Sequence, residues 1–146
     1  MFLNELNENE ATAFINVVSE FANVDNTFAK EEKEVLEGYL KDLKLTKDII
    51  GKLNFDKSLQ TLNESKDRIK KIVYFELIGL ALVDGEYGDK EVEFLDNIAK
   101  QFGISRTKKI AFANYFYNFT DVYKFSVVES ENKIELLREQ AEAILA

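Results

Sequence analysis

The chain has 146 residues, a net charge of −8 and an apolar fraction of 46%, and it contains no cysteine, histidine or proline. These absences exclude disulfides, thiolate zinc sites, cysteine nucleophiles and histidine-based catalytic triads. The acidic balance argues against a nucleic-acid partner, because phosphate binding needs concentrated lysine and arginine. The length predicts one domain over residues 1–146, and the lack of proline permits long helices throughout.

The sequence also bears on where the protein works. No uncharged run of about 18 residues is present, so we expect no transmembrane helix. The acidic start Met-Phe-Leu-Asn-Glu-Leu lacks the basic residues and apolar stretch of a signal peptide. Together these features predict a cytoplasmic protein.

The first expected helix runs to about residue 23, and Asn7 with Glu10 forms a capping box at its start. Its apolar residues recur at helical spacing: Ala13, Phe14, Val17, Val18 and Phe21. A loop over residues 24–32 leads into a second helix. The positions that this second helix is expected to bury are Val35, Leu36, Tyr39, Leu40 and Leu43.

Residues 46–65 are mostly polar and are expected to form short helices that cross over the core. A structureless loop of that length is uncommon inside a compact domain. The candidate N-caps are Thr46 for one short helix, Asn54 or Asp56 for another, and Asn63 or Ser65 for the long helix that follows.

The stretch from residue 72 to residue 102 is the expected centre of the fold. Ile72–Val83 is apolar at every position except Glu76 and Gly79, and a helix that is apolar all round lies in the middle of a fold. An acidic, turn-prone loop follows it. The next helix is amphipathic, with one apolar face made by Phe94, Leu95, Ile98, Ala99 and Phe102.

These two pairs of helices repeat each other at a constant offset of 59 residues, without a gap over 24 residues. The identical pairs are Ala22, Val24, Asp25, Glu32, Glu34, Leu36 and Lys41, which recur as Ala81, Val83, Asp84, Glu91, Glu93, Leu95 and Lys100. We therefore predict two antiparallel helical hairpins, about residues 8–45 and 66–104, since neither hides its apolar face alone. With the C-terminal helices, this gives an all-α bundle of about seven helices.

Beyond the second hairpin, Gly103 is expected to stop one helix and Ser105 to cap the next. Residues 106–127 are predicted to form a helix rich in rings: Phe112, Tyr115, Phe116, Tyr117, Phe119, Tyr123 and Phe125. One stripe is expected for Phe112, Phe116, Phe119 and Tyr123, with Tyr115 and Tyr117 directed elsewhere. Such density is typical of a core helix, while rings on several sides also fit a partner surface. A last amphipathic helix is expected over residues 131–146.

The acidic loops are the first candidate site. Asp25 and Asp84 each precede a glutamate by seven residues, Glu32 and Glu91. One interpretation is structural, because a glutamate in the first turn of a helix offsets the helix dipole. The alternative is a divalent cation, since hard cations prefer oxygen ligands and the second loop holds four carboxylates in eight residues. An EF-hand is excluded, because position twelve from Asp84 is Leu95. If the loops lie together, the four residues form a single site.

Glu76 is a second candidate, a carboxylate among apolar helical neighbours. Such a group needs a hydrogen bond or a cation to compensate its charge, and it sometimes marks a site. The plain interpretation is that a tyrosine hydroxyl, a lysine or a loop amide binds it. The catalytic alternative is a carboxylate hydrolase or lyase that uses Glu76 with Asp84, and it predicts a deep pocket between the hairpins with Glu76 in its lining.

The run FELIGLALVDGEYGDKEVEFLDNIAKQFGIS resembles the TerB-like helical domain family, which includes tellurite-resistance TerB and the N-terminal domain of the membrane-anchored co-chaperone DjlA. The shared pattern is an apolar helix ending in Ala-x-x-Asp-Gly, a later glutamate, and an amphipathic helix ending near glycine. It is carried here by Ala81, Asp84, Gly85, Glu91, Leu95, Ile98, Ala99 and Gly103, and in the first hairpin by Ala22, Asp25, Glu32 and Leu36. The resemblance covers roughly residues 1–120, and it departs from the family at Asn26 and Ala29.

The resemblance implies an all-helical fold without enzymatic activity and with an acidic surface patch. It further implies a role in stress response or in resistance to metals and oxyanions such as tellurite. The patch is expected to dock a protein partner, including one in a membrane-associated complex, or to hold a divalent cation. The alternative is a homodimer or scaffold that uses the aromatic helix over residues 106–127.

Overall fold

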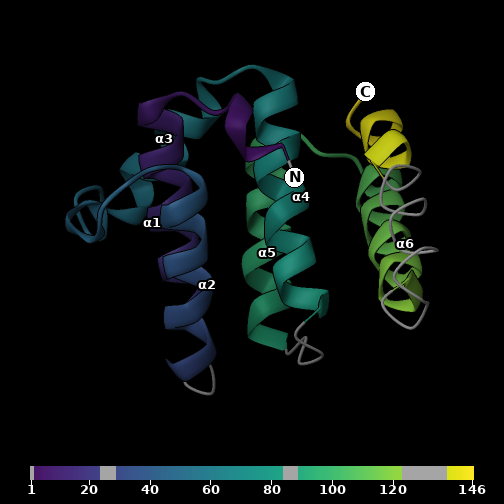
Figure 1. Cartoon of the computed structure of the whole chain (residues 1–146). Coiled ribbons are helices and arrows are strands. Elements are labelled where there is room, and N and C mark those ends of the chain that lie inside the picture. Colours follow the sequence, from purple (N-terminus) through teal and green to yellow (C-terminus); the bar gives the residue numbers. More distant parts are fainter. Residues whose placement is uncertain (1, 24–28, 84–88, 123–137) are drawn as a thin grey trace.

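The computed structural model of the chain describes residues 2–23, 29–83, 89–122 and 138–146. Helices make up most of these residues, and no strand occurs among them, so the predicted all-α class is confirmed (Figure 1). None of the described helices is long and apolar enough to cross a membrane. The elements, with η for a 3-10 helix, are η1 (Leu3–Glu5), α1 (Glu8–Asn23), α2 (Ala29–Asp42), η3 (Lys47–Ile49), α3 (Phe55–Asn63), α4 (Asp67–Val83), α5 (Asp89–Phe102) and α6 (Arg106–Val122). Residues 138–145 form a further helix, called here the C-terminal helix.

The start of α1 is the predicted capping box. The Glu10 backbone N–H donates to Asn7 Oδ1 over 2.8 Å, and the Asn7 backbone N–H donates to Glu10 Oε1 over 3.0 Å. From there α1 packs against both α2 and α3. Its buried face contains the five predicted residues, each no more than 2% exposed: Ala13, Phe14, Val17, Val18 and Phe21.

The crossover between the hairpins consists of the predicted short helices, η3 and α3. Asn54 caps α3 by accepting a hydrogen bond from the Lys57 backbone N–H over 2.8 Å. Thr46 precedes η3, and its side chain makes no capping bond to the backbone of that helix.

A buried amide fastens this crossover to α1. The Asn16 side chain, 5% exposed, donates through Nδ2 to the Ile49 carbonyl over 3.1 Å. Its Oδ1 accepts from the Gly51 backbone N–H over 2.6 Å. Because a buried amide is stable only when its polar atoms are bonded, these contacts fix where the crossover lies on α1.

The predicted N-cap of α4 is wrong. The helix begins at Asp67 after Lys66, whose carbonyl accepts from the Lys70 backbone N–H over 3.1 Å. Asn63 is the last residue of α3, and the Ser65 hydroxyl donates to the Thr61 carbonyl over 3.3 Å. Both candidate caps therefore serve the end of α3 instead of the start of α4.

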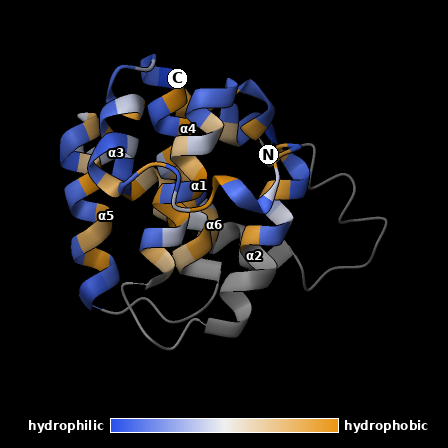
Figure 2. Cartoon of the chain, turned by 90° about the vertical axis from the view of Figure 1, so that its left-hand side faces the viewer, coloured by the Kyte–Doolittle hydropathy of each residue, from blue (hydrophilic) through white to orange (hydrophobic). Residues whose placement is uncertain are grey.

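Helix α4 lies in the centre, as predicted, and contacts η1, α3, α5 and α6. Its fully or almost fully buried residues are Ile72, Val73, Tyr74, Phe75, Leu77, Ile78 and Ala81. Figure 2 shows hydrophobic residues gathered towards the interior, with hydrophilic residues along the outer sides of α3 and α5. The apolar composition of α4 is thus matched by neighbours on several sides.

Helix α6 begins at the predicted cap, where Ser105 Oγ accepts from the Lys108 backbone N–H over 3.2 Å. Phe112, Tyr115 and Phe116 are all buried, and their ring centroids lie 5.9, 5.1 and 4.8 Å from that of Phe75. The prediction that Tyr115 points away from the stripe is wrong, because residues three apart share one helical face. The rings of Tyr117, Phe119, Tyr123 and Phe125 lie outside the described part of the chain.

The two hairpins pack crosswise. Phe21 of α1 contacts Phe94 of α5, with 5.3 Å between ring centroids, and Tyr39 of α2 bonds Glu76 of α4. The first helix of each hairpin therefore meets the second helix of the other. The duplication of the sequence stays a prediction.

The second helices of the two hairpins, α2 and α5, end alike. Leu45 N–H donates to the Leu40 carbonyl over 2.8 Å, and Ile104 N–H donates to the Ala99 carbonyl over 2.9 Å. The preceding residues, Lys44 and Gly103, adopt φ values of 58° and 69°. Both ends are thus Schellman-type terminations, and only the second carries the glycine that this conformation favours.

Replacing Lys44 with glycine is expected to raise the free energy of unfolding by about 1 kcal/mol, because glycine adopts a positive φ without the steric cost of a Cβ. Gly103→Ala is the matched control and is expected to lower it by a similar amount. No atom lies within 4 Å of a Cβ built at Gly103, so that loss is conformational. Denaturant unfolding measures both. An unchanged stability for Lys44→Gly would contradict the left-handed conformation at this residue.

Gly79 allows the Phe116 ring to lie against the backbone of α4. A Cβ added there would lie 2.6 Å from Phe116 Cζ. We expect Gly79→Ala to lower the free energy of unfolding by about 1–3 kcal/mol through overpacking. Adding Phe116→Leu is expected to recover part of that loss, because it removes the clashing ring atoms. Strictly additive effects in the double-mutant cycle would argue against this contact.

Candidate functional site

The predicted acidic site lies at one end of the bundle, where α1 leads to α2 and α4 leads to α5. Asp25 and Asp84 lie outside the described residues, and so does the side chain of Glu32. The helix ends that flank both connections are described: Asn23, Ala29, Val83 and Asp89. Figure 1 shows all of them at the lower end of the bundle. The helix ends that flank the two hairpin connections therefore lie at the same end of the bundle.

An aromatic cluster joins the hairpins close to this end. Phe21 lies two residues before the end of α1, and its ring contacts Phe94 near the start of α5, with 5.3 Å between centroids. On the other side, Phe55 of α3 contacts the same Phe94 ring at 5.2 Å. Aromatic pairs at these distances contribute more to stability than the burial of their apolar area alone. The cluster holds the end of α1 beside the start of α5.

Glu91 is the acidic candidate whose side chain the structure describes. It lies in the first turn of α5, as predicted, and is 3% exposed. A carboxylate there interacts favourably with the positive end of the helix dipole, which agrees with the structural interpretation. Its burial places it inside this end of the bundle, beneath the surface.

The metal interpretation depends on residues beyond the described ranges. Among the residues that the structure describes, no three acidic side chains are grouped so as to hold a metal ion. A divalent cation at this end would therefore need ligands from the connections, such as Asp25 or Asp84. The donor chemistry fits, since carboxylate oxygens are what hard cations prefer.

Glu76 is bonded in one of the ways that its sequence context predicted. The Tyr39 hydroxyl of α2 donates to Glu76 Oε2 over 3.2 Å. Burial and the nearby Glu76 carboxylate raise the pKa of Tyr39 far above its usual value, so the hydroxyl keeps its proton and stays a donor. The Phe14 ring packs edge-on against Tyr39, with 5.1 Å between centroids. The catalytic alternative stays a prediction, since Asp84 lies outside the described residues.

Sequence reasoning predicted Tyr39 as a buried position of the second helix and missed its role as the partner of Glu76. The two residues are 37 positions apart in the chain. Only the packing of α2 against α4 brings them together, and no local pattern reports such a pair.

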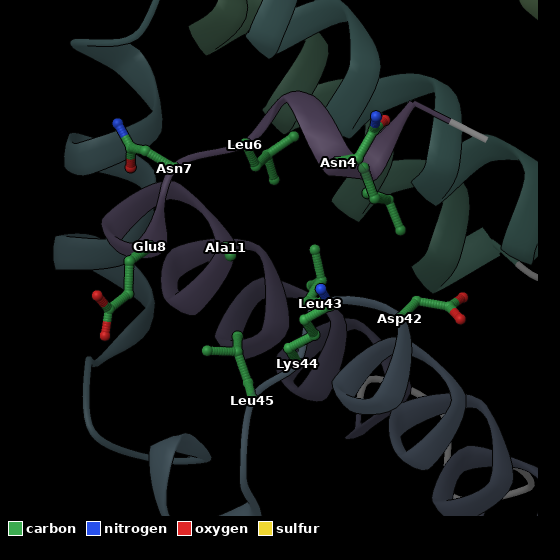
Figure 3. Close-up of a pocket in the computed structure, with 10 residues that line it drawn as sticks. Asn4, Leu6, Asn7, Glu8, Ala11, Asp42, Leu43, Lys44 and Leu45 are labelled. Atoms are coloured by element: carbon green, nitrogen blue, oxygen red, sulfur yellow. The ribbon is translucent and has the colours of Figure 1, made fainter.

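A hollow of about 520 Å³ lies at the opposite end of the bundle, between the start of the chain and the end of α2 (Figure 3). Leu3, Leu6, Ala11, Leu43 and Leu45 provide its apolar lining, and Asn4, Asn7, Glu8, Asp42 and Lys44 its polar lining. No local pattern predicted this hollow, because its two sides come from segments more than 30 residues apart. Chemically, it is suited to an apolar group with a polar edge.

Comparison of the chain with protein-family models, with curated proteins and with solved structures finds no match. The resemblance to the TerB-like family therefore rests on the residues of this chain alone.

Removing the Tyr39 hydroxyl is expected to weaken the contact between the hairpins. Tyr39→Phe should lower the free energy of unfolding by about 1–2 kcal/mol, because a hydrogen bond to a charged group is lost. Combining it with Glu76→Leu should cost less than the sum of the single changes, with a coupling of about 0.5–2 kcal/mol. Denaturant unfolding of the four proteins measures this. A coupling of zero would mean that the bond contributes nothing to stability.

Proposed function

We propose that this chain is a non-catalytic, TerB-like helical domain that binds a protein partner through the end of the bundle carrying the α1–α2 and α4–α5 connections. The observation that carries the proposal is the contact between Phe21 and Phe94, which holds the ends of the two hairpins side by side. Asp25, Glu32, Asp84 and Glu91 all belong to these connections or to the helix turns beside them.

The charge of this end defines the partner. Glu20 in α1 and Asp89 and Glu93 in α5 are exposed beside the connections. With a net charge of −8 on the whole chain, this end attracts a basic segment of another protein, and opposite charges speed and orient such an encounter. A divalent cation is the second ligand that we propose here, held by carboxylate oxygens of the four predicted residues, Asp25, Glu32, Asp84 and Glu91.

The setting of this function follows from the resemblance alone. TerB-like proteins suggest stress response or tellurite resistance, and the DjlA-like domain suggests a complex linked to a membrane. The proposal of a cytoplasmic site of action rests instead on the sequence features given above, not on the resemblance.

The alternative, self-association through the aromatic helix 106–127, receives less support. Phe112, Tyr115 and Phe116 are buried against α4 and are therefore used inside the chain. Among the α6 side chains that the structure describes, up to Phe116, Ile110 is the large apolar residue that is exposed, at 52%, and a single isoleucine makes a small contact surface.

Thermal unfolding with and without Ca²⁺, Mg²⁺, Mn²⁺ or Zn²⁺ tests the cation. A cation at 100 times its dissociation constant is expected to add about 2.7 kcal/mol of stability. The gain should disappear in Asp25→Asn/Asp84→Asn and persist in the control Asp42→Asn/Asp48→Asn, whose carboxylates are exposed elsewhere. An equal gain in both double variants would contradict cation binding at the connections.

The same two variants test the protein partner. Binding to a basic protein partner should weaken in Asp25→Asn/Asp84→Asn and in high salt, and should be unchanged in the control. A partner whose affinity is the same for both variants would contradict the proposed surface.

A further inference from the structure

Lys44, directly after α2, has a backbone conformation that is unfavourable for a lysine. Its φ of 58° is left-handed, and a residue with a Cβ adopts this conformation at a steric cost. The matching residue after α5, 59 positions later, is Gly103, which adopts a similar conformation without that cost. A lysine therefore occupies a position where a glycine would give a more stable helix end.

The helix dipole does not account for this lysine. A cation near the C-terminus of a helix is stabilising, and Lys41 already provides one in the last turn of α2. Helix α5 has the same arrangement, with Lys100 in its last turn and a glycine after it. Within the described part of the chain, the Lys44 ammonium group forms no ion pair or hydrogen bond. Its charge is available to a ligand.

The Lys44 side chain lines the hollow between the start of the chain and the end of α2. The volume of this hollow, about 520 Å³, is typical of a site for a small molecule. Three leucines of its lining are only partly buried, so a ligand in the hollow would remove more of their surface from water. The apolar part of the lining is aliphatic throughout: Leu3, Leu6, Ala11, Leu43 and Leu45. Such a surface suits an alkyl chain.

The polar part of the lining offers a cation to such a chain. Figure 3 shows the carboxylates of Glu8 and Asp42 directed to opposite sides, away from the middle of the hollow, and the nitrogen of Lys44 directed towards its middle. Asn7 is already used in the capping box, where its Oδ1 accepts from the Glu10 backbone N–H. Lys44 is therefore the charged side chain that a molecule in the hollow would meet.

We propose that this hollow binds a medium-chain fatty acid, with the alkyl chain against the leucines and the carboxylate paired with the Lys44 ammonium group. Backbone strain of the kind found at Lys44 is often located at ligand-binding positions. Here the strained residue supplies the cation that pairs with the ligand. The hollow lies at the opposite end of the bundle from the acidic connections, so this site is separate from the one in the proposed function.

Isothermal titration calorimetry with sodium octanoate tests the proposal. Octanoate is expected to bind the parent chain, and its affinity should exceed that of hexanoate by about fourfold for each added methylene group. Lys44→Met is expected to weaken octanoate binding about tenfold, because the carboxylate loses its charged partner. Lys44→Gly should lose the same affinity while being more stable than the parent, so misfolding cannot explain the loss. The matched control Lys41→Met removes an exposed charge of α2 outside the hollow and should bind octanoate like the parent.

Two further ligands of the same chain length separate recognition of the carboxylate from binding of any alkyl chain. Octanol and octylamine are both expected to bind more weakly than octanoate. The proposal is overturned if octanoate does not bind the parent, if octanol or octylamine binds as tightly, or if Lys41→Met loses as much affinity as Lys44→Met.

Nuclear magnetic resonance of the leucine methyl groups locates the ligand. Octanoate is expected to shift the methyl signals of Leu6, Leu43 and Leu45, which line the hollow. Shifts confined to other leucines would contradict the site. The variant Asp25→Asn/Asp84→Asn should bind octanoate like the parent, so the outcome of this experiment is independent of the proposed function.

Discussion

The need to cover α4 on almost every side is the constraint on which the rest of this structure depends. No single neighbour can shield a helix that buries Ile72, Phe75, Leu77 and Ala81 at once. Helices α5 and α6 and the crosswise packing of the first hairpin supply the cover, so the hydrophobic effect dictates a bundle of several layers. The polar exception, Glu76, lies where α2 brings a hydroxyl donor to it.

The same packing also fixes the helix ends beside the two hairpin connections. Rings from α1, α3 and α5 meet at Phe94 and hold the lower ends of the helices in a fixed relation. The binding proposed for this end would involve helix ends that this cluster already holds in place, and preorganisation of that kind reduces the entropy lost on association. Glu91, in the first turn of α5, is buried at this same end of the bundle.

Local features of the fold were predictable from the sequence, and features made by distant residues were not. The capping box of Asn7 and Glu10 and the cap at Ser105 involve residues three positions apart, so a short window of sequence contains all their atoms. The predicted N-cap of α4 was wrong, because Ser65 lies between two helices and its hydroxyl bonds the end of α3 instead of the start of α4. At the candidate site, the sequence identified Glu76, while its donor lies 37 residues away. The Arg68 guanidinium bonds the carboxylates of Glu5 and Glu142, which are 63 and 74 residues away in the chain. No local sequence pattern predicts contacts between residues so far apart.

The Arg68 contacts have a topological consequence as well. Because one guanidinium binds both Glu5 and Glu142, the two termini lie near each other at the upper end of the bundle (Figure 1). A short linker would suffice to join them, and a circular permutant opened elsewhere would keep every helix in place. Tags or fused domains at either terminus would crowd the same end and leave the acidic end clear.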